Sequence, residues 1–150
     1  MELSKRMQAV ADFVPFGSRH CDIRTDHGYV PIYLIPRGIA EHVLAMDVRS
    51  GPLEIAASNL EKYCMKDRIT LRLSDGLDKM EKGEADCIII AGMGGLLIRQ
   101  ILSEGLDKLE QADHLILQPH SDMDQVRKWL HENGFVILKE KMLIDAGKYY

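Results

Sequence analysis

The stretch Ala85-Asp86-Cys87-Ile88-Ile89-Ile90-Ala91 is followed at once by Gly92-Met93-Gly94-Gly95. An apolar run of this length, bounded by glycines, predicts a strand over 85–91 that other elements cover on both faces. Such a strand belongs in the middle of a parallel sheet. The glycines are expected to end the strand, and the apolar spacing that follows predicts a helix over 96–103.

The same order of strand and helix recurs along the chain. Further strands are predicted at 20–23, 42–48, 69–73 and 114–117, and further helices at 4–13, 29–37, 53–63 and 122–133. About five alternations imply right-handed βαβ crossovers. We therefore expect an α/β fold, with a mostly parallel, doubly wound sheet and helices on both of its faces.

The C-terminal residues are harder to place in this scheme. A sixth strand is predicted at 135–138, and residues 141–144 are expected to prolong it. The chain then ends at Gly147-Lys148-Tyr149-Tyr150 without a visible closing element. A fragment, or a domain cut before its last strand, is expected to end in this way.

Composition predicts one ordinary soluble domain over residues 1–150. Hydrophobic residues make up 46%, which is enough for one core without disulfide or metal staples. The net charge of −4 gives no overall basic footprint for nucleic acid. Cys21, Cys64 and Cys87 are far apart and form no CxxC pair, so reduced thiols in a cytoplasmic protein fit best. No signal peptide or apolar run of membrane-spanning length is seen.

Polar or glycine-rich residues follow each of the five regular strands. In an open α/β sheet, ligands bind outside the carboxyl ends of the strands, close to the point where strand order reverses. Five coincidences of this kind are hard to obtain from a purely structural domain. The residues concerned are 22–28, Asp47, Asp75-Gly76, Gly92–Gly95 and Gln118-Pro119-His120.

Two aspartates indicate an adenosyl ligand. Asp47, at the tip of the second strand, is suited to accept hydrogen bonds from a ribose diol, although a helix-capping Asp is an equally good reading. Asp75 is suited to receive an adenine amino group, or else forms a simple Asp-Gly turn. The loop after the first strand has neither a GxGxxG nor a P-loop pattern, which argues against NAD and ATP. S-adenosylmethionine (SAM) has ribose and adenine but no phosphate, so it is the expected cofactor.

Histidines supply the candidates for acid/base chemistry. His27 and His120 lie in strand-end loops, and imidazole titrates near neutrality. A loop histidine is nevertheless more often only a hydrogen-bonding residue. No set of His, Cys or carboxylate residues has the spacing of a metal site, so no metal is expected.

The motifs together resemble the TrmK family, SAM-dependent tRNA (adenine-N1)-methyltransferases that act on adenine 22 of bacterial tRNA. The resemblance runs from one end of the chain to the other and implies a Rossmann-like class I methyltransferase fold. The motifs that carry it are Leu3-Ser4-Lys5-Arg6, Val14-Pro15, Asp22-Ile23, Asp26-His27-Gly28-Tyr29, Pro31-Ile32, Ile90-Ala91-Gly92-Met93-Gly94-Gly95, Leu115-Ile116-Leu117-Gln118-Pro119, Trp129-Leu130, Gly134-Phe135 and the final four residues.

The resemblance also implies roles for individual residues. The methionine side of SAM is expected at Asp22, Asp26 and His27, the ribose at Asp47, and the adenine at Asp75 and Gly76. The methyl group and target base are expected beside Gly92, Met93 and Gly94, with Gln118 and Pro119 closing the substrate side. Of these, the implied catalytic residues are Asp26, His27, Met93, Gln118 and Pro119, and the cofactor site extends to Ile23, Val48 and Ala91.

One residue departs from the family pattern, which has glycine where this chain has Arg24. Glycine there lets the backbone pass close to the cofactor and adopt a positive φ. We expect the long cation either to obstruct the pocket or to swing outward and contact phosphate.

The resemblance implies tRNA as partner and also a C-terminal helical domain that grips it, which is expected to be missing here. No membrane and no obligate protein partner are expected. Two alternatives stay open at this point, a methyltransferase for a small molecule or protein, and a non-catalytic SAM-binding or RNA-binding module.

Overall fold

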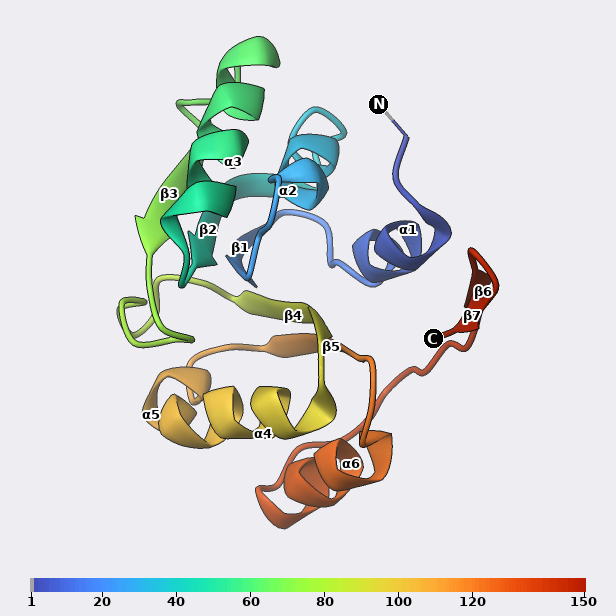
Figure 1. The fold of residues 1–150 in the computed structure, drawn as a ribbon. Helices are drawn as coiled ribbons and strands as arrows, with labels where there is room; N and C mark the ends of the chain where they lie inside the picture. The colour runs from blue at the N-terminus through green and yellow to red at the C-terminus, as the bar shows by residue number, and fades with distance from the viewer. Residues whose placement is uncertain (1) are drawn as a thin grey trace.

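Five parallel strands form the central sheet in the computed structural model, which describes residues 2–150 (Figure 1). The strands are β1 (Ser18–Ile23), β2 (Ala40–Asp47), β3 (Ile69–Leu73), β4 (Cys87–Met93) and β5 (His114–Pro119). Their order across the sheet is β3-β2-β1-β4-β5, and every neighbouring pair is parallel. The predicted doubly wound sheet is confirmed, and strand order reverses between β1 and β4.

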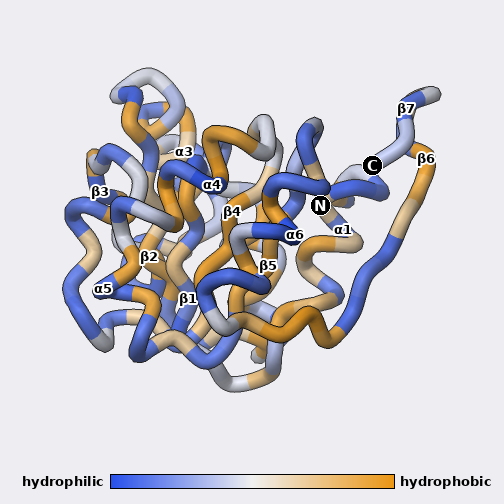
Figure 2. The backbone as a smooth tube through the Cα atoms, turned by 90° about the horizontal axis from the view of Figure 1, so that it is seen from below, coloured by the Kyte–Doolittle hydropathy of each residue, from blue (hydrophilic) through white to orange (hydrophobic). Residues whose placement is uncertain are grey.

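Helices cover both faces of the sheet (Figure 1). One face carries α1 (Lys5–Asp12), α2 (Tyr29–Leu34) and α3 (Ser50–Lys62), and the other carries α4 (Gly95–Glu104), α5 (Leu106–Leu109) and α6 (Met123–Glu132). Each layer of helices encloses its own apolar core. Figure 2 shows the hydrophobic colour along the central strands, as a sheet covered on both faces requires.

The two faces of β1 differ in chemistry. Cys21 and Ile23 point into the core under α4 and α6. Asp22 lies beside Ala45 of β2 and Ile89 of β4, both of which belong to the core under α1 and α2. Because side chains alternate along a strand, His20 and Asp22 share that second face. Both are almost completely buried.

Local signals account for the ends of several helices. The Ser4 hydroxyl accepts a hydrogen bond from the Met7 backbone N–H at 3.2 Å, so Ser4 is the N-cap of α1. Gly134 has a φ of +80° directly after the C-cap of α6, a conformation that glycine adopts readily and that ends the helix. The short α5 carried no sequence signal of its own and was not predicted.

Strand β4 extends further than predicted. It continues through Gly92 to Met93, which pairs with Pro119 of β5 across an irregularity in the register. Gly92 has a φ of +76° and forms a bulge within the strand. The strand therefore does not end at Gly92.

The predicted sixth strand at 135–138 and 141–144 is wrong. Residues 135–143 form no strand, and Val136 and Leu138 are 80% and 77% exposed. Instead, β6 (Ile144–Asp145) and β7 (Lys148–Tyr149) form an antiparallel hairpin. This hairpin packs against α1, where the Arg6 backbone N–H donates to Asp145 Oδ2 at 3.0 Å. An apolar segment becomes a strand only where another strand bonds to it, and composition does not supply that partner.

Candidate functional site

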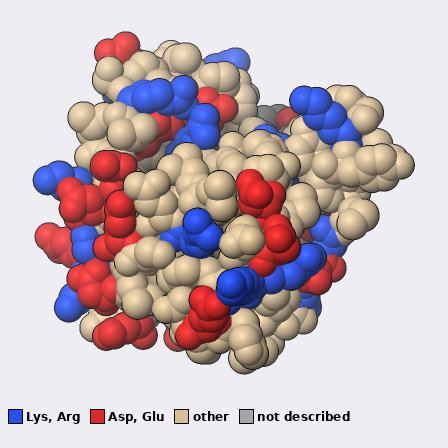
Figure 3. Space-filling view, turned by 60° about the horizontal axis from the view of Figure 1, so that its bottom comes forward, with Lys and Arg blue, Asp and Glu red and all other residues tan. Residues whose placement is uncertain are grey.

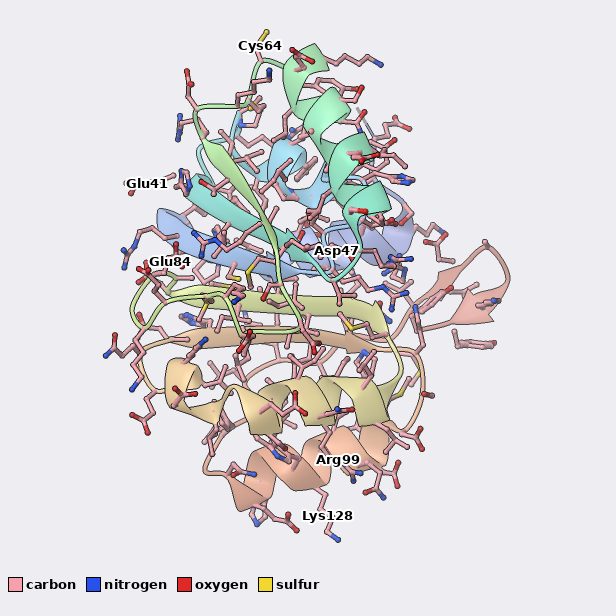
Figure 4. All side chains as sticks on the ribbon, turned by 60° about the vertical axis from the view of Figure 1, so that its left-hand side comes forward. Glu41, Asp47, Cys64, Glu84, Arg99 and Lys128 are labelled. Carbon is pink, nitrogen blue, oxygen red and sulfur yellow. The ribbon has the colours of Figure 1, made fainter. Side chains whose placement is uncertain are left out.

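A pocket of about 340 Å³ opens at the carboxyl ends of β1 and β4, where the strand order reverses. Its walls come from α1, the β1–α2 loop, the start of α2, the end of β4, and two flanking loops. Figure 4 shows Asp47 at this end of β2, with Glu41 at the other end of the same strand. The lining residues are Arg6, Met7, Val10, Asp22, Arg24, Thr25, Asp26, Val30, Arg49, Ile89, Ala91, Gly92 and His120.

The floor of this pocket is acidic. Burial, with the negative charges of Asp47 and Asp26, raises the pKa of Asp22 from 3.8 to about 7. Asp47 is 2% exposed. Its Oδ1 accepts from the Arg49 backbone N–H at 3.0 Å and from Arg49 Nε at 3.4 Å. Its Oδ2 is buried and has no hydrogen-bond partner among residues 2–150. A buried hydrogen-bond acceptor without a donor destabilises the fold. A donor group on a bound ligand would satisfy this oxygen.

The loop after β1 is held in an unusual backbone conformation. Arg24, Asp26 and Gly28 have φ values of +60°, +55° and +76°. The positive φ expected at position 24 is therefore present, although the residue is arginine. Because a left-handed conformation costs a residue with a Cβ on the order of 1 kcal/mol, the loop is strained at two of these positions. Asp26 is exposed and lines the pocket.

The loop after β4 is organised by Gln118. The Gln118 Oε1 atom accepts from the Gly92 backbone N–H at 3.0 Å and from Arg6 Nη1 at 2.9 Å. Two glycines of this loop meet different structural requirements. Gly92 has its positive φ, whereas a Cβ at Gly95 would overlap the backbone carbonyl oxygen of Ser121. Gly95 therefore serves close packing of the β5–α6 loop, not the approach of a ligand.

The pocket brings together four of the predicted site residues, Asp22, Asp26, Ala91 and Gly92. Asp47 lies behind Arg49, which lines it. The roles assigned to all of these remain predictions.

The other predicted site residues lie around the pocket and do not line it. Ile23 and Met93 are buried in the core under α4. Val48 and Asp75 are exposed at the ends of β2 and β3. His27 lies with Nε2 3.7 Å from Asp26 Oδ1 and its ring edge-on to Tyr29. The rest are half-buried: Gly76 and Gly94 lie in the loops that follow β3 and β4, and Gln118 and Pro119 are the last two residues of β5.

Several pocket residues escaped prediction as site residues. Arg6, Met7 and Val10 all come from α1, whose helical pattern indicates only burial, although Arg6 is part of a motif that resembles the family. Thr25 and His120 belong to the polar stretches predicted after the first and fifth strands, and His120 was also an acid/base candidate, but neither was assigned a ligand contact. Arg49 had no signal beyond its closeness to Asp47. Burial, with the charges of Arg6, Arg24 and Lys148, lowers the pKa of His120 below 6.5.

The family described as methyltransferase domain matches residues 3–150. This chain belongs to that family. The tRNA (adenine(22)-N(1))-methyltransferase of Bacillus subtilis is 41% identical to this methyltransferase domain over 150 residues, which are 100% of the chain and 63% of that protein. The chain thus spans less than two thirds of the length of that relative.

Solved structures agree with the sequence match. Streptococcus pneumoniae Sp1610 in complex with S-adenosyl-L-methionine superposes with a TM-score of 0.97 at 43% identity, covering 99% of this chain and 70% of that one. The Mycoplasma capricolum TrmK in complex with S-adenosyl-homocysteine gives 0.88 at 28% identity, covering 100% and 66%. The resemblance to TrmK proteins that the motifs indicated is confirmed.

Residues 2–150 contain neither a candidate metal-binding cluster nor a helix that could span a membrane. No group of three or more His, Cys, Asp or Glu side chains there is arranged to hold a metal ion. None of the helices in this part of the chain has the length and apolar character that crossing a membrane requires.

Proposed function

We propose that this chain is a SAM-binding catalytic domain that transfers a methyl group to N1 of an adenine in tRNA, at position 22 by likeness to the Bacillus subtilis relative. The observation that carries the cofactor assignment is Asp47 Oδ2, a buried acceptor without a donor at the tip of β2. A ribose hydroxyl is a donor of the right kind for that oxygen.

The remaining groups fit the other parts of the same ligand. SAM carries positive charge on its sulfonium and ammonium groups, and Asp22 and Asp26 bring carboxyl groups to the pocket. Asp75 offers an exposed carboxylate after β3 for the adenine amino group. The pocket has no phosphate-binding loop, and SAM has no phosphate for such a loop to hold.

When bound, SAM would supply an activated methyl group to the lone pair of adenine N1, and the electron pair of the broken S–CH3 bond would stay on sulfur. The task of this chain is to hold N1 in line with the methyl group, at the roughly 3 to 3.5 Å of a near-attack geometry. The Gly92 loop, fixed by the hydrogen bonds to Gln118, forms one wall of that space. Methylation leaves the adenine cationic, and Asp26 stabilises that charge or accepts the amino proton.

The RNA must expose its target base to this pocket. A base within folded tRNA is flipped out or presented by distortion, at a cost of a few kcal/mol. We place the reaction in the cytoplasm, which suits the three unpaired cysteines Cys21, Cys64 and Cys87.

The test is methyl transfer from labelled SAM to bulk tRNA, with a metabolite panel and a protein mixture as competing acceptors. The chain is assayed alone and in a form extended at its C-terminus, because the relatives are longer. Label in tRNA supports the proposal. Label found only in metabolites or only in protein would mean that tRNA is not the substrate. If both forms of the chain bind SAM but transfer no methyl group, the chain is a binding module and not an enzyme.

Calorimetry tests the cofactor site directly. Asp47→Asn removes the charged acceptor, and a lost charge-assisted hydrogen bond is worth about 1.5–3 kcal/mol, so SAM affinity should fall by at least about tenfold. Glu41→Gln, at the opposite end of β2, is the matched control and should leave SAM affinity unchanged. If the Asp47→Asn and wild-type proteins bind SAM with equal affinity, Asp47 does not contact the cofactor.

A further inference from the structure

Two arginines and a histidine gather on the wall of the pocket around Gly92. Arg24 Nη1 approaches the Gly92 carbonyl oxygen at 3.5 Å, which is a weak hydrogen bond. Arg6 Nη1 donates to Gln118 Oε1 at 2.9 Å, and the same oxygen accepts the Gly92 N–H. His120 lines the same wall. These three side chains come from the β1–α2 loop, α1 and the loop after β5, which the fold brings together.

Neither arginine is neutralised within the described chain. Among residues 2–150, no carboxylate oxygen lies within 4.0 Å of the guanidinium nitrogens of Arg6 or Arg24. Arg49, on the same pocket, does pair with Asp47. The Arg6 guanidinium instead lies 5.8 Å from the centre of the Tyr150 ring. The two guanidinium groups thus lie close to Gly92 without an ion-pair partner of their own, and an anion bound beside Gly92 would supply one.

The charges in the pocket differ in depth. Asp22 is buried at the floor and Asp47 is buried behind Arg49, whereas Arg24, His120 and the carboxylate of Asp26 are exposed at the rim. Lys148, from the β6–β7 hairpin, is also exposed, and its charge acts on His120 together with those of Arg6 and Arg24. A cofactor reaches the floor, but a macromolecular substrate meets the rim first. We therefore expect the anion that binds at this rim to belong to the substrate.

We propose that Arg24, supported by Arg6 and His120, binds a backbone phosphate of the RNA next to the target nucleotide. The guanidinium fork matches the oxygens of a phosphodiester and forms charge-assisted hydrogen bonds with them. Phosphate contacts fix register without reading sequence. This inference rests on the proposed function and names the group that positions its substrate.

A local contact of this kind matters more when there is no broad basic surface. The chain carries 19 Lys and Arg against 23 Asp and Glu. On the face drawn in Figure 3, the two signs are interspersed and form no single basic area. Arg6 and Arg24, which have no ion-pair partner among residues 2–150, then add to the electrostatic attraction to RNA at the pocket itself.

The experiment measures tRNA and SAM binding separately, by fluorescence anisotropy and by calorimetry, with the full chain. The variants are Arg24→Gln, Arg24→Lys and the control Lys128→Gln, which removes a charge from an exposed residue of α6 far from Asp47 (Figure 4). Arg24→Gln should weaken tRNA binding about tenfold and lower the salt slope by about 1. Arg24→Lys should retain most of the affinity, and Lys128→Gln all of it.

Each remaining outcome overturns the inference. If Arg24→Gln binds tRNA as the wild type does, Arg24 contacts no phosphate. If it loses SAM affinity and keeps tRNA affinity, Arg24 binds the cofactor's carboxylate. Wild-type protein that binds no tRNA refutes the inference as well. The proposed function fails in a different way, when wild-type protein binds tRNA but transfers no methyl group to it.

Discussion

Asp26 is an exposed carboxylate held in a left-handed backbone conformation. It has a φ of +55°, and it is exposed in a loop at the mouth of the pocket. Asparagine tolerates a left-handed conformation at least as well as aspartate, so Asp26→Asn removes the charge without disturbing the loop. We expect SAM affinity to change little and turnover to fall by a factor of about 100, as for loss of an acid/base group. Single-turnover methylation and calorimetry check this, and unchanged turnover would falsify the role of Asp26.

Asp22 predicts how cofactor binding depends on pH. Its pKa is about 7, mainly because the carboxyl group is buried. Below that pH the group is neutral and does not attract a cation, so SAM affinity should rise as pH increases from 5.5 to 7.5 and then level off. The rise is at most about tenfold per pH unit. Calorimetry at each pH should give a flatter profile for Asp22→Asn, and a wild-type affinity independent of pH rejects the assignment.

At the scale of helices and strands, the sequence predicts those features that depend on residues close together in the chain. The five strands of the sheet were located because buried parallel strands read as apolar runs, and the residues at their tips indicated the edge that holds the pocket. The predicted strand over 135–138 failed because pairing depends on a partner that the pattern does not reveal. Arg6 was missed for the same reason, since its contact with Gln118 joins positions 112 residues apart.

The junction of β4 with α4 predicts a substitution that the fold does not tolerate. A Cβ at Gly95 would overlap Ser121 O and lie 2.7 Å from the Asp122 carbonyl oxygen, so the β5–α6 loop must move. We expect Gly95→Ala to lower the free energy of unfolding by about 1–3 kcal/mol. Gly51→Ala is the control, because a Cβ there has nothing within 4 Å and lies in the first turn of α3. Alanine at Gly51 should stabilise by up to about 1 kcal/mol.

Urea titration of both glycine variants measures these changes. Because the Gly95→Ala substitution also displaces the loop that follows Gln118 and Pro119, turnover should fall together with stability. Equal stability of the Gly95→Ala and wild-type proteins would show that this loop is free to adjust.

For the whole molecule, two buried groups on β1 give opposite dependences of stability on pH. His20 is 1% exposed, its Nδ1 has no hydrogen-bond partner among residues 2–150, and burial lowers its pKa from 6.5 to about 4. Between those values the unfolded chain binds a proton that the folded chain does not, so stability rises with pH. Asp22 behaves in the opposite way from pH 3.8 to about 7, because the folded chain keeps a proton that the unfolded chain releases.

The two effects overlap between about pH 4 and 6.5, where they should nearly cancel in the ligand-free wild type. Asp22→Asn leaves only the His20 effect, so its free energy of unfolding should rise by up to about 3 kcal/mol across that window. His20→Leu leaves only the Asp22 effect and should become less stable by a similar amount as pH rises. Urea unfolding at pH 4.5, 5.5 and 6.5 measures both slopes, and the double variant is the control with a flat profile. If the free energy of unfolding of Asp22→Asn and His20→Leu changed with pH in the same direction, the opposite effects assigned to His20 and Asp22 would be wrong.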